Sequence, residues 1–293
     1  MVAVDQEFDS YVGKDLGVQQ LTITPDLVQR YVDAVRDDHP WYMGPSPFGG
    51  PVAPALIVHS APHRFSGWYL KNRYGNLHAK QEWWLFHPIM VGETVTLHAL
   101  ITDRYVKRGR DYVVNEVTIS DARGRTLARV ASHQSFLIDD RAQGIVVDKD
   151  RERALGRRFE VQADTVLEAL TGIRRLVDEA MCERYSGPAR NYHNDREEAR
   201  KLGFPDIVVQ GTMSTCFISE MMTRRFGVGW WRGGRMSVNF VNILWVNEAV
   251  TARGIVTART PEGERVRHHC QVWVEKDDGT KVTIGTASAV EGW

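Results

Sequence analysis

The chain has 293 residues, of which 43% are apolar and 25% charged, and its 37 basic residues balance 37 acidic ones. This composition is typical of a globular protein with one large or two ordinary domains, whose core needs no disulfide or metal. The balanced, scattered charge excludes nucleic-acid binding and attraction to an anionic membrane. No stretch approaches the roughly 18 consecutive apolar residues of a membrane span, and the acidic N-terminus is unlike a signal peptide.

Three cysteines, Cys182, Cys216 and Cys270, are odd in number and far apart. They form neither a CxxC pair nor a Cys/His pattern, so we expect reduced thiols and a cytoplasmic protein. Cys216 falls in an apolar helical pattern, which favours a core position over a nucleophile. The sequence has no phosphate-binding glycine loop, and the adjacent His268 and His269 would face opposite sides of a strand. No cofactor and no metal is implied.

The first half predicts two helices followed by strands. Thr24-Pro25 is typical of a helix start, and apolar residues recur at helical spacing as far as Val35. After a polar break at 37–40, the apolar segment 51–70 predicts a central helix. The β-rich runs that follow are 81–86, 94–102, 112–120 and 126–137. We therefore expect an α+β domain in which an antiparallel sheet wraps around a central helix.

The second half repeats this plan. A helical run covers 166–183, and Asp195 and Glu198 form a capping box for a short helix. Gly211 opens a second central helix, which Gly227 ends. The strand-like runs that follow are 236–244, 250–258, 266–275 and 281–290.

Internal similarity indicates that the halves are a duplication. Segment 87–104 parallels segment 242–259, and Glu93 aligns with Glu248 at an offset of 155 residues. The predicted division is an N-terminal domain over 1–140, a linker over 141–158 and a C-terminal domain over 159–293.

The segment SGPARNYHNDREEARKLGFPDIVVQGT, residues 186–212, carries the most specific pattern in the chain. It resembles the motif of the MaoC-like (R)-specific enoyl-CoA hydratase/dehydratase family. That motif has an Asp, an Asn-Pro pair and a His, then an acid, a small helix and a Gly that opens the central helix. The matching positions are Ser186-Gly187, His193, Asp195, Ala199, Gly203-Phe204 and Gly211. The resemblance covers nearly the whole chain and implies a fused double hotdog fold.

Two positions depart from the family pattern. Pro188 stands where the family has its catalytic Asp, and Arg190-Asn191 replaces the Asn-Pro pair. In the first half, the run DDHPWY places Asp37 at the Asp position and Tyr42 at the His position. One half therefore keeps the acid and the other keeps the imidazole. Pseudo-symmetry would place the two motifs in separate sites.

Hydration of an enoyl thioester needs a base for the water, an acid for the adjacent carbon and a donor for the enolate oxygen. An imidazole suits either proton-transfer role near neutral pH, and a backbone N–H at a helix N-terminus stabilises an oxyanion. The resemblance implies His193 as acid/base and Gly211 as the N–H donor, with Asn191 orienting water or the thioester. Substrate-binding roles are expected for Asp37, Tyr42, Arg190 and Gln210.

Each of these roles has a structural alternative. His193 could be a surface or capping residue, and Gly211 could relieve crowding at a helix start. Asp195 is favoured as an N-cap over a catalyst. Asp37 and Tyr42 could be remnants or substrate-entry residues, and Asp37 could equally end a helix or shape a turn.

The resemblance favours a hydro-lyase acting on an enoyl or 3-hydroxyacyl thioester of CoA or an acyl-carrier protein. One alternative is a hotdog thioesterase, which would need a carboxylate on the central helix, where Glu220 is the one available. Another is a non-catalytic partner subunit that binds an acyl thioester, because both motifs are imperfect. A lyase or cyclase would use the same enolate stabilisation. The fused pair already forms a pseudo-dimer, and a homodimer of the whole chain is compatible with it.

Overall fold

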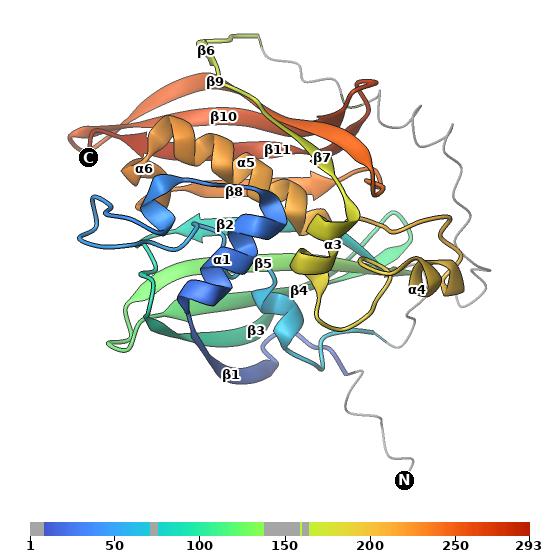
Figure 1. Cartoon of the computed structure of the whole chain (residues 1–293). Helices are drawn as coiled ribbons and strands as arrows, with labels where there is room; N and C mark the ends of the chain where they lie inside the picture. The colour runs from blue at the N-terminus through green and yellow to red at the C-terminus, as the bar shows by residue number, and fades with distance from the viewer. Residues whose placement is uncertain (1–8, 71–75, 138–158, 160–163) are drawn as a thin grey trace.

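The computed structural model describes residues 9–70, 76–137, 159 and 164–293 (Figure 1). The strands of this part of the chain join in one 11-stranded sheet in the order β1-β3-β4-β5-β2-β8-β11-β10-β9-β6, and β7 also pairs with β9. Strands of the first half are β1 (Asp15–Thr22), β2 (Leu77–Leu85), β3 (Thr94–Lys107), β4 (Arg110–Ser120) and β5 (Thr126–Leu137). Those of the second half are β6 (Glu168–Ala169), β7 (Ile173–Val177), β8 (Arg235–Phe240), β9 (Glu248–Glu262), β10 (Arg265–Lys276) and β11 (Lys281–Glu291).

The helices lie on the concave side of this sheet and at its edges (Figure 1). The α-helices are α1 (Pro25–Val35), α3 (Glu179–Ser186), α4 (Arg196–Lys201), α5 (Gly211–Phe226) and α6 (Val228–Trp231). Two short 3-10 helices, η2 (Pro40–Tyr42) and η3 (Ala61–Arg64), belong to the first half. Within the described part of the chain, no helix combines the length and apolar character needed to cross a membrane.

The two halves meet where β2 pairs with β8. Glu82 lies opposite Ser237, whose hydroxyl donates to the Glu82 carboxylate at 3.1 Å. Trp83 pairs with Met236, as Gln81 does with Val238, so the ladder is symmetric about the Glu82–Ser237 pair. These two residues are 155 positions apart, the same offset that relates the two turn glutamates. An approximate two-fold axis therefore passes through this pair, and the duplication read from the sequence is present in the sheet.

The central helix of the second half is confirmed. Helix α5 begins at Gly211 and ends before Gly227, as predicted, and nearly all of its residues are buried. It packs against β9, β10 and β11, which curve around it (Figure 1). Because the helix is surrounded on all sides, its polar residues are buried along with its apolar ones.

The α-helix predicted over 51–70 is wrong. The segment forms turns and the single 3-10 turn η3, although its apolar side chains, such as Leu56 and Ile57, are buried as a central helix would bury them. Pro54 and Pro62 explain the difference. Proline lacks the backbone N–H that a helix interior needs, and it disfavours helical backbone at the preceding residue.

The helix predicted over 166–183 is wrong in its first part, which forms β6 and β7 along the edge of β9. A side chain at Gly172 would lie 3.1 Å from the carbonyl oxygen of Ala252, so glycine allows the two backbones to approach. The remainder, from Glu179, is α3. Strand β1 is not predicted, whereas the other predicted runs coincide with β2–β5 and β8–β11. The proposed linker, 141–158, lies outside the described residues, and the domain boundaries stay a prediction.

Candidate functional site

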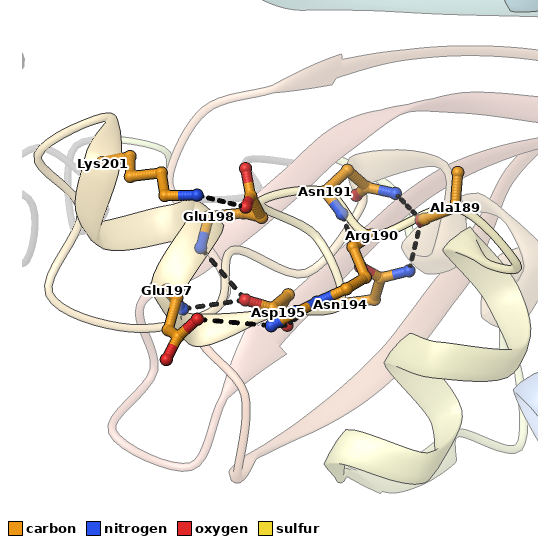
Figure 2. Close-up of polar contacts among 8 residues, drawn as sticks. All are labelled: Ala189, Arg190, Asn191, Asn194, Asp195, Glu197, Glu198 and Lys201. Carbon is orange, nitrogen blue, oxygen red and sulfur yellow. Dashed lines mark hydrogen bonds and ion pairs between the residues drawn. The ribbon is translucent and has the colours of Figure 1, made fainter.

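The loop between α3 and α4 presents His193, and two asparagines shape it (Figure 2). The Asn191 side-chain amide donates to the carbonyl oxygens of Ser186 at 3.0 Å and Ala189 at 2.9 Å. Its oxygen accepts the N–H of His193 at 2.9 Å. Asn194 closes the loop by donating to Ala189 at 3.0 Å and accepting the N–H of Asn191 at 2.8 Å. The role of Asn191 in orienting water or the thioester stays a prediction. Its amide builds the loop and positions the backbone of His193.

Asp195 is the N-cap of α4, as predicted. Its carboxylate accepts the N–H groups of Glu197 at 2.9 Å and Glu198 at 3.1 Å (Figure 2). Arg190 donates to the same carboxylate at 2.6 Å. The Glu198 N–H and then the Arg190 guanidinium lower the pKa of the Asp195 carboxyl below its ordinary value. Arg190 therefore ties the loop to the helix cap, and its substrate-binding role stays a prediction.

The ring of His193 is fixed by one short hydrogen bond. Its Nδ1 donates to the carbonyl oxygen of Val208 at 2.7 Å, and the ring of Tyr192 lies beside it at 3.9 Å between centroids. A carbonyl can only accept, so the proton is on Nδ1 and the lone pair is on Nε2. Burial lowers the pKa of His193 to about 4. The side chain is therefore a neutral imidazole at neutral pH, with Nε2 able to accept a proton.

Gly211 begins α5 three residues after Val208, so the strand-like segment that holds the His193 ring leads directly into the helix N-terminus. Gln210 is the N-cap residue, but its side chain makes no cap hydrogen bond and instead accepts from the Ser186 hydroxyl at 2.9 Å. A Cβ at Gly211 would lie 3.1 Å from the ring of Phe240. Glycine therefore lets Phe240 pack against the helix start. It also leaves the helix N-terminus partly accessible, as an oxyanion donor requires.

The first half contributes two histidines that the sequence analysis missed. The His63 ring lies 5.3 Å from the ring of His78, which in turn lies 4.7 Å from Phe240. The Nδ1 of His63 is 3.2 Å from the Tyr69 hydroxyl. Burial and then the charge of His193 lower the pKa of His63 to about 4. Imidazoles of both halves therefore gather near the start of α5. His63, in the run HSAPHRF, was a signal available in the sequence, but the helical interpretation of 51–70 concealed it, and His78 lies just before the predicted run 81–86.

Asp37 and Tyr42 form a pair of their own in the first half. The Tyr42 hydroxyl donates to the Asp37 carboxylate at 2.7 Å, and each residue is 2% exposed. Burial raises the pKa of both groups. The pair is therefore part of the packed interior, and the substrate-binding role expected of both residues stays a prediction. His193 bonds to Val208 in the other half, so Asp37 and His193 do not form a hydrogen-bonded dyad.

Comparisons with known proteins agree with this architecture. Residues 10–130 match the family model described as FAS1-like, dehydratase domain region. A solved structure described as MaoC-like dehydratase is 16% identical over 98% of this chain and 99% of its own, with a TM-score of 0.70. The MaoC-like dehydratase from Phytophthora capsici is 17% identical over 99% of this chain and 98% of its own, with a TM-score of 0.69. A Mycobacterium tuberculosis protein described as a double hotdog is 13% identical over 96% of each chain, with a TM-score of 0.58.

The chain has the double hotdog fold of the MaoC-like dehydratases. No curated protein matches its sequence.

Within this double hotdog, the family match and the His193 loop fall on different halves. The match ends at residue 130, before the loop and before α5. The predicted double hotdog fold is confirmed. The roles of individual side chains rest on the geometry described above. Pro188, exposed at the end of α3, remains the departure from the motif of a MaoC-like dehydratase.

Proposed function

We propose that the chain is a hydro-lyase that hydrates an enoyl thioester or dehydrates a 3-hydroxyacyl thioester. The carrier is CoA or an acyl-carrier protein. One observation carries the proposal. The 2.7 Å bond from Nδ1 of His193 to the carbonyl oxygen of Val208 leaves Nε2 as a free base, and Val208 belongs to the segment that leads into the N-terminus of α5. A base next to a helix N-terminus is the pairing that addition of water to an enoyl thioester requires.

The reaction balances with one imidazole. Nε2 of His193 takes a proton from water, and the water oxygen bonds to Cβ of the enoyl group. The double-bond electrons move to the thioester oxygen, where the Gly211 N–H donates to the enolate. The imidazolium then returns its proton to Cα, and the carbonyl re-forms. Dehydration is the reverse sequence. The same group serves as base and acid, so Pro188 need not supply a carboxylate.

We assign His63 a positioning role in the same site. It lies close enough to His193 for the charge of one to lower the pKa of the other, and Tyr69 holds its ring at 3.2 Å. When Tyr69 donates to Nδ1, the proton of His63 is on Nε2, where it can donate to a water oxygen. His63→Gln should raise KM and lower kcat about tenfold, because one hydrogen bond to water is lost while the base remains.

The test is the loss of ultraviolet absorbance of the conjugated thioester over a panel of enoyl-CoA substrates of increasing chain length. His193→Ala should lower kcat roughly 10²–10⁴-fold, the usual contribution of one general acid–base group. His98→Ala is the control, because His98 lies on β3 and pairs with Asp15 at 3.1 Å. Equal turnover by the His193 variant and the wild type would contradict the site assignment.

The thioesterase alternative receives little support from Glu220. Its carboxylate is 1% exposed and paired with Arg175 at 2.6 Å and Arg224 at 2.8 Å. It lies nine residues beyond Gly211, about 14 Å along the helix at 1.5 Å per residue. A non-catalytic partner subunit is favoured by Pro188 alone. Release of free thiol from acyl-CoA would indicate the first alternative, and CoA binding without turnover would indicate the second.

A further inference from the structure

A cavity of about 260 Å³ opens where α1, the segment around η3 and the end of α3 meet. Three arginines line it, one from each of these elements: Arg30, Arg64 and Arg184. No Asp or Glu is among the described residues that line it. The cavity is therefore a positively charged recess in a chain whose net charge is zero.

The three arginines are exposed, and none forms an ion pair within the described residues. Arg64 donates one N–H, from Nε, to the Gln19 side chain at 3.3 Å, which leaves its terminal N–H groups available. Other arginines of the described residues are paired with carboxylates, as Arg225 is with both Glu168 and Glu291. Unpaired arginines that converge from three elements are suited to bind an anion, and the planar guanidinium matches phosphate geometry.

The inner wall supplies a second, independent observation. The Nδ1 atom of His59 is buried and lacks a hydrogen-bond partner among the described residues. Its ring stacks on Tyr185 at 4.1 Å, which fixes its orientation at the cavity wall. Buried polar atoms are rarely left without a partner, so an unpaired one beside a cavity points to a ligand group or water.

The cavity adjoins the candidate site. Gly187 and Pro188, which line it, begin the loop that presents His193. His59 lies four residues before His63 on the same first-half segment. A molecule bound in the recess therefore lies next to both loops that supply imidazoles to the site.

We propose that this recess binds the phosphate of the pantetheine arm that carries the acyl thioester. The inference rests on the proposed function. Ligand sites for whole small molecules measure roughly 300–1,000 Å³. The recess, at 260 Å³, fits the phosphate-bearing end of the arm and not an entire CoA. Both CoA and the phosphopantetheine of a carrier protein present this phosphate.

The test is calorimetric titration of the full chain with CoA, 3′-dephospho-CoA, 4′-phosphopantetheine and unphosphorylated pantetheine. The pocket variant replaces Arg30, Arg64 and Arg184 by Gln together, and thermal unfolding verifies that it folds. The matched control removes the same charge elsewhere, by Arg108→Gln, Arg123→Gln and Arg235→Gln. We expect the pocket variant to weaken binding of all three phosphorylated ligands at least tenfold, with the control and the pantetheine affinity unchanged.

The four ligands separate the two sources of the phosphate. If 4′-phosphopantetheine binds as tightly as CoA, the recess recognises the phosphate of the arm alone, which fits a carrier protein. If 3′-dephospho-CoA binds tenfold more weakly than CoA, the carrier of the acyl group is identified as CoA. The proposal is overturned if the pocket variant binds CoA as the wild type does, or if phosphopantetheine binds no better than pantetheine. His193→Ala should retain CoA affinity. A chain that binds CoA through these arginines yet converts no enoyl thioester would contradict the proposed function and leave this inference intact.

Discussion

Glu93 and Glu248 make the same hydrogen bond in the two halves, although 155 residues separate them. Each carboxylate accepts the backbone N–H of the residue three positions earlier, Met90 at 3.1 Å and Trp245 at 2.9 Å. The turns they close lead into β3 and β9, the longest strand of each half. The repeated glutamate therefore fixes where each of these strands begins.

Removing either carboxylate should destabilise the fold. We expect Glu93→Ala and Glu248→Ala each to lower the free energy of unfolding by about 1 kcal/mol, because a charge-assisted bond at a partly exposed turn is lost. The Gln variants keep an acceptor oxygen and should lose less than half as much. Urea denaturation followed by tryptophan fluorescence measures both. If the Ala and Gln variants at either position lose the same free energy of unfolding, the hydrogen bond to the backbone N–H is not the cause of the loss.

Much of the fold could be predicted because strand alternation and the duplicated turn are local signals. The runs that became β3, β4, β9 and β10 alternate in burial along part of their length, as their sequences do. The central helix over 51–70 could not be predicted correctly, since an apolar run is equally suited to a buried helix and to buried turns. Pro54 and Pro62 carried the contrary signal.

The site was predictable only where its residues are neighbours in sequence. His193 and Gly211 belong to one motif, whereas His63 reaches them across the junction of the two halves, a long-range contact that no spacing reveals. Asn191 and Arg190 were assigned to substrate because they flank a histidine. In the structure the Asn191 side chain bonds to backbone groups of the loop, and the Arg190 side chain bonds to the α4 cap residue Asp195. Short polar side chains commonly bond to nearby backbone groups in this way.

Acid should destabilise the protein through buried histidines. Burial lowers the pKa of four rings, to about 3 or 4 for three of them; they are His59, His63, His78 and His193. Each ring takes up a proton on unfolding when the pH lies below 6.5, the ordinary histidine pKa, and above its pKa in the folded protein. Its contribution to the free energy of unfolding is therefore complete above pH 6.5 and falls as the pH drops. Burial raises the pKa of Glu220 to about 7 and also raises the pKa of Asp37, so these two carboxyls release protons on unfolding and partly offset the histidines. The four rings outnumber the two carboxyls, so a net uptake of protons on unfolding predicts a free energy of unfolding that falls as the pH drops below 6.5.

Urea unfolding at half-unit pH intervals measures this slope. His59→Phe removes one titrating ring while keeping an aromatic stack on Tyr185, so its slope should be smaller by about one proton, or ~1.4 kcal/mol per pH unit. A slope in the His59 variant equal to that of the wild type would contradict burial as the cause.

The pH dependence of turnover should reflect the low pKa of His193. A base must be neutral to accept a proton, and the His193 ring is neutral above a pH of about 4. We expect kcat/KM to stay level between pH 8 and 5 and to fall only as the pH approaches 4. Rates are taken within seconds of a pH jump, with fluorescence confirming that the chain is still folded. An acid limb near pH 6.5 would mean that the catalytic group has an ordinary imidazole pKa, and is not the buried ring of His193.

Asp37 and Tyr42 should affect stability and leave turnover intact, because the two side chains are buried and hydrogen-bonded to each other. Tyr42→Phe leaves the Asp37 carboxylate without its hydroxyl donor, and Oδ1 of Asp37 already has no partner among the described residues. We expect a loss of about 2–3 kcal/mol, the usual cost of stranding a buried charged acceptor. Asp37→Asn keeps an oxygen for Tyr42 and removes the buried charge, so its loss should be smaller. Chemical denaturation gives both values, and the enoyl-thioester assay should show kcat within twofold of wild type. A fall in kcat comparable to that of His193→Ala, in a variant that remains folded, would show instead that the first-half motif takes part in catalysis.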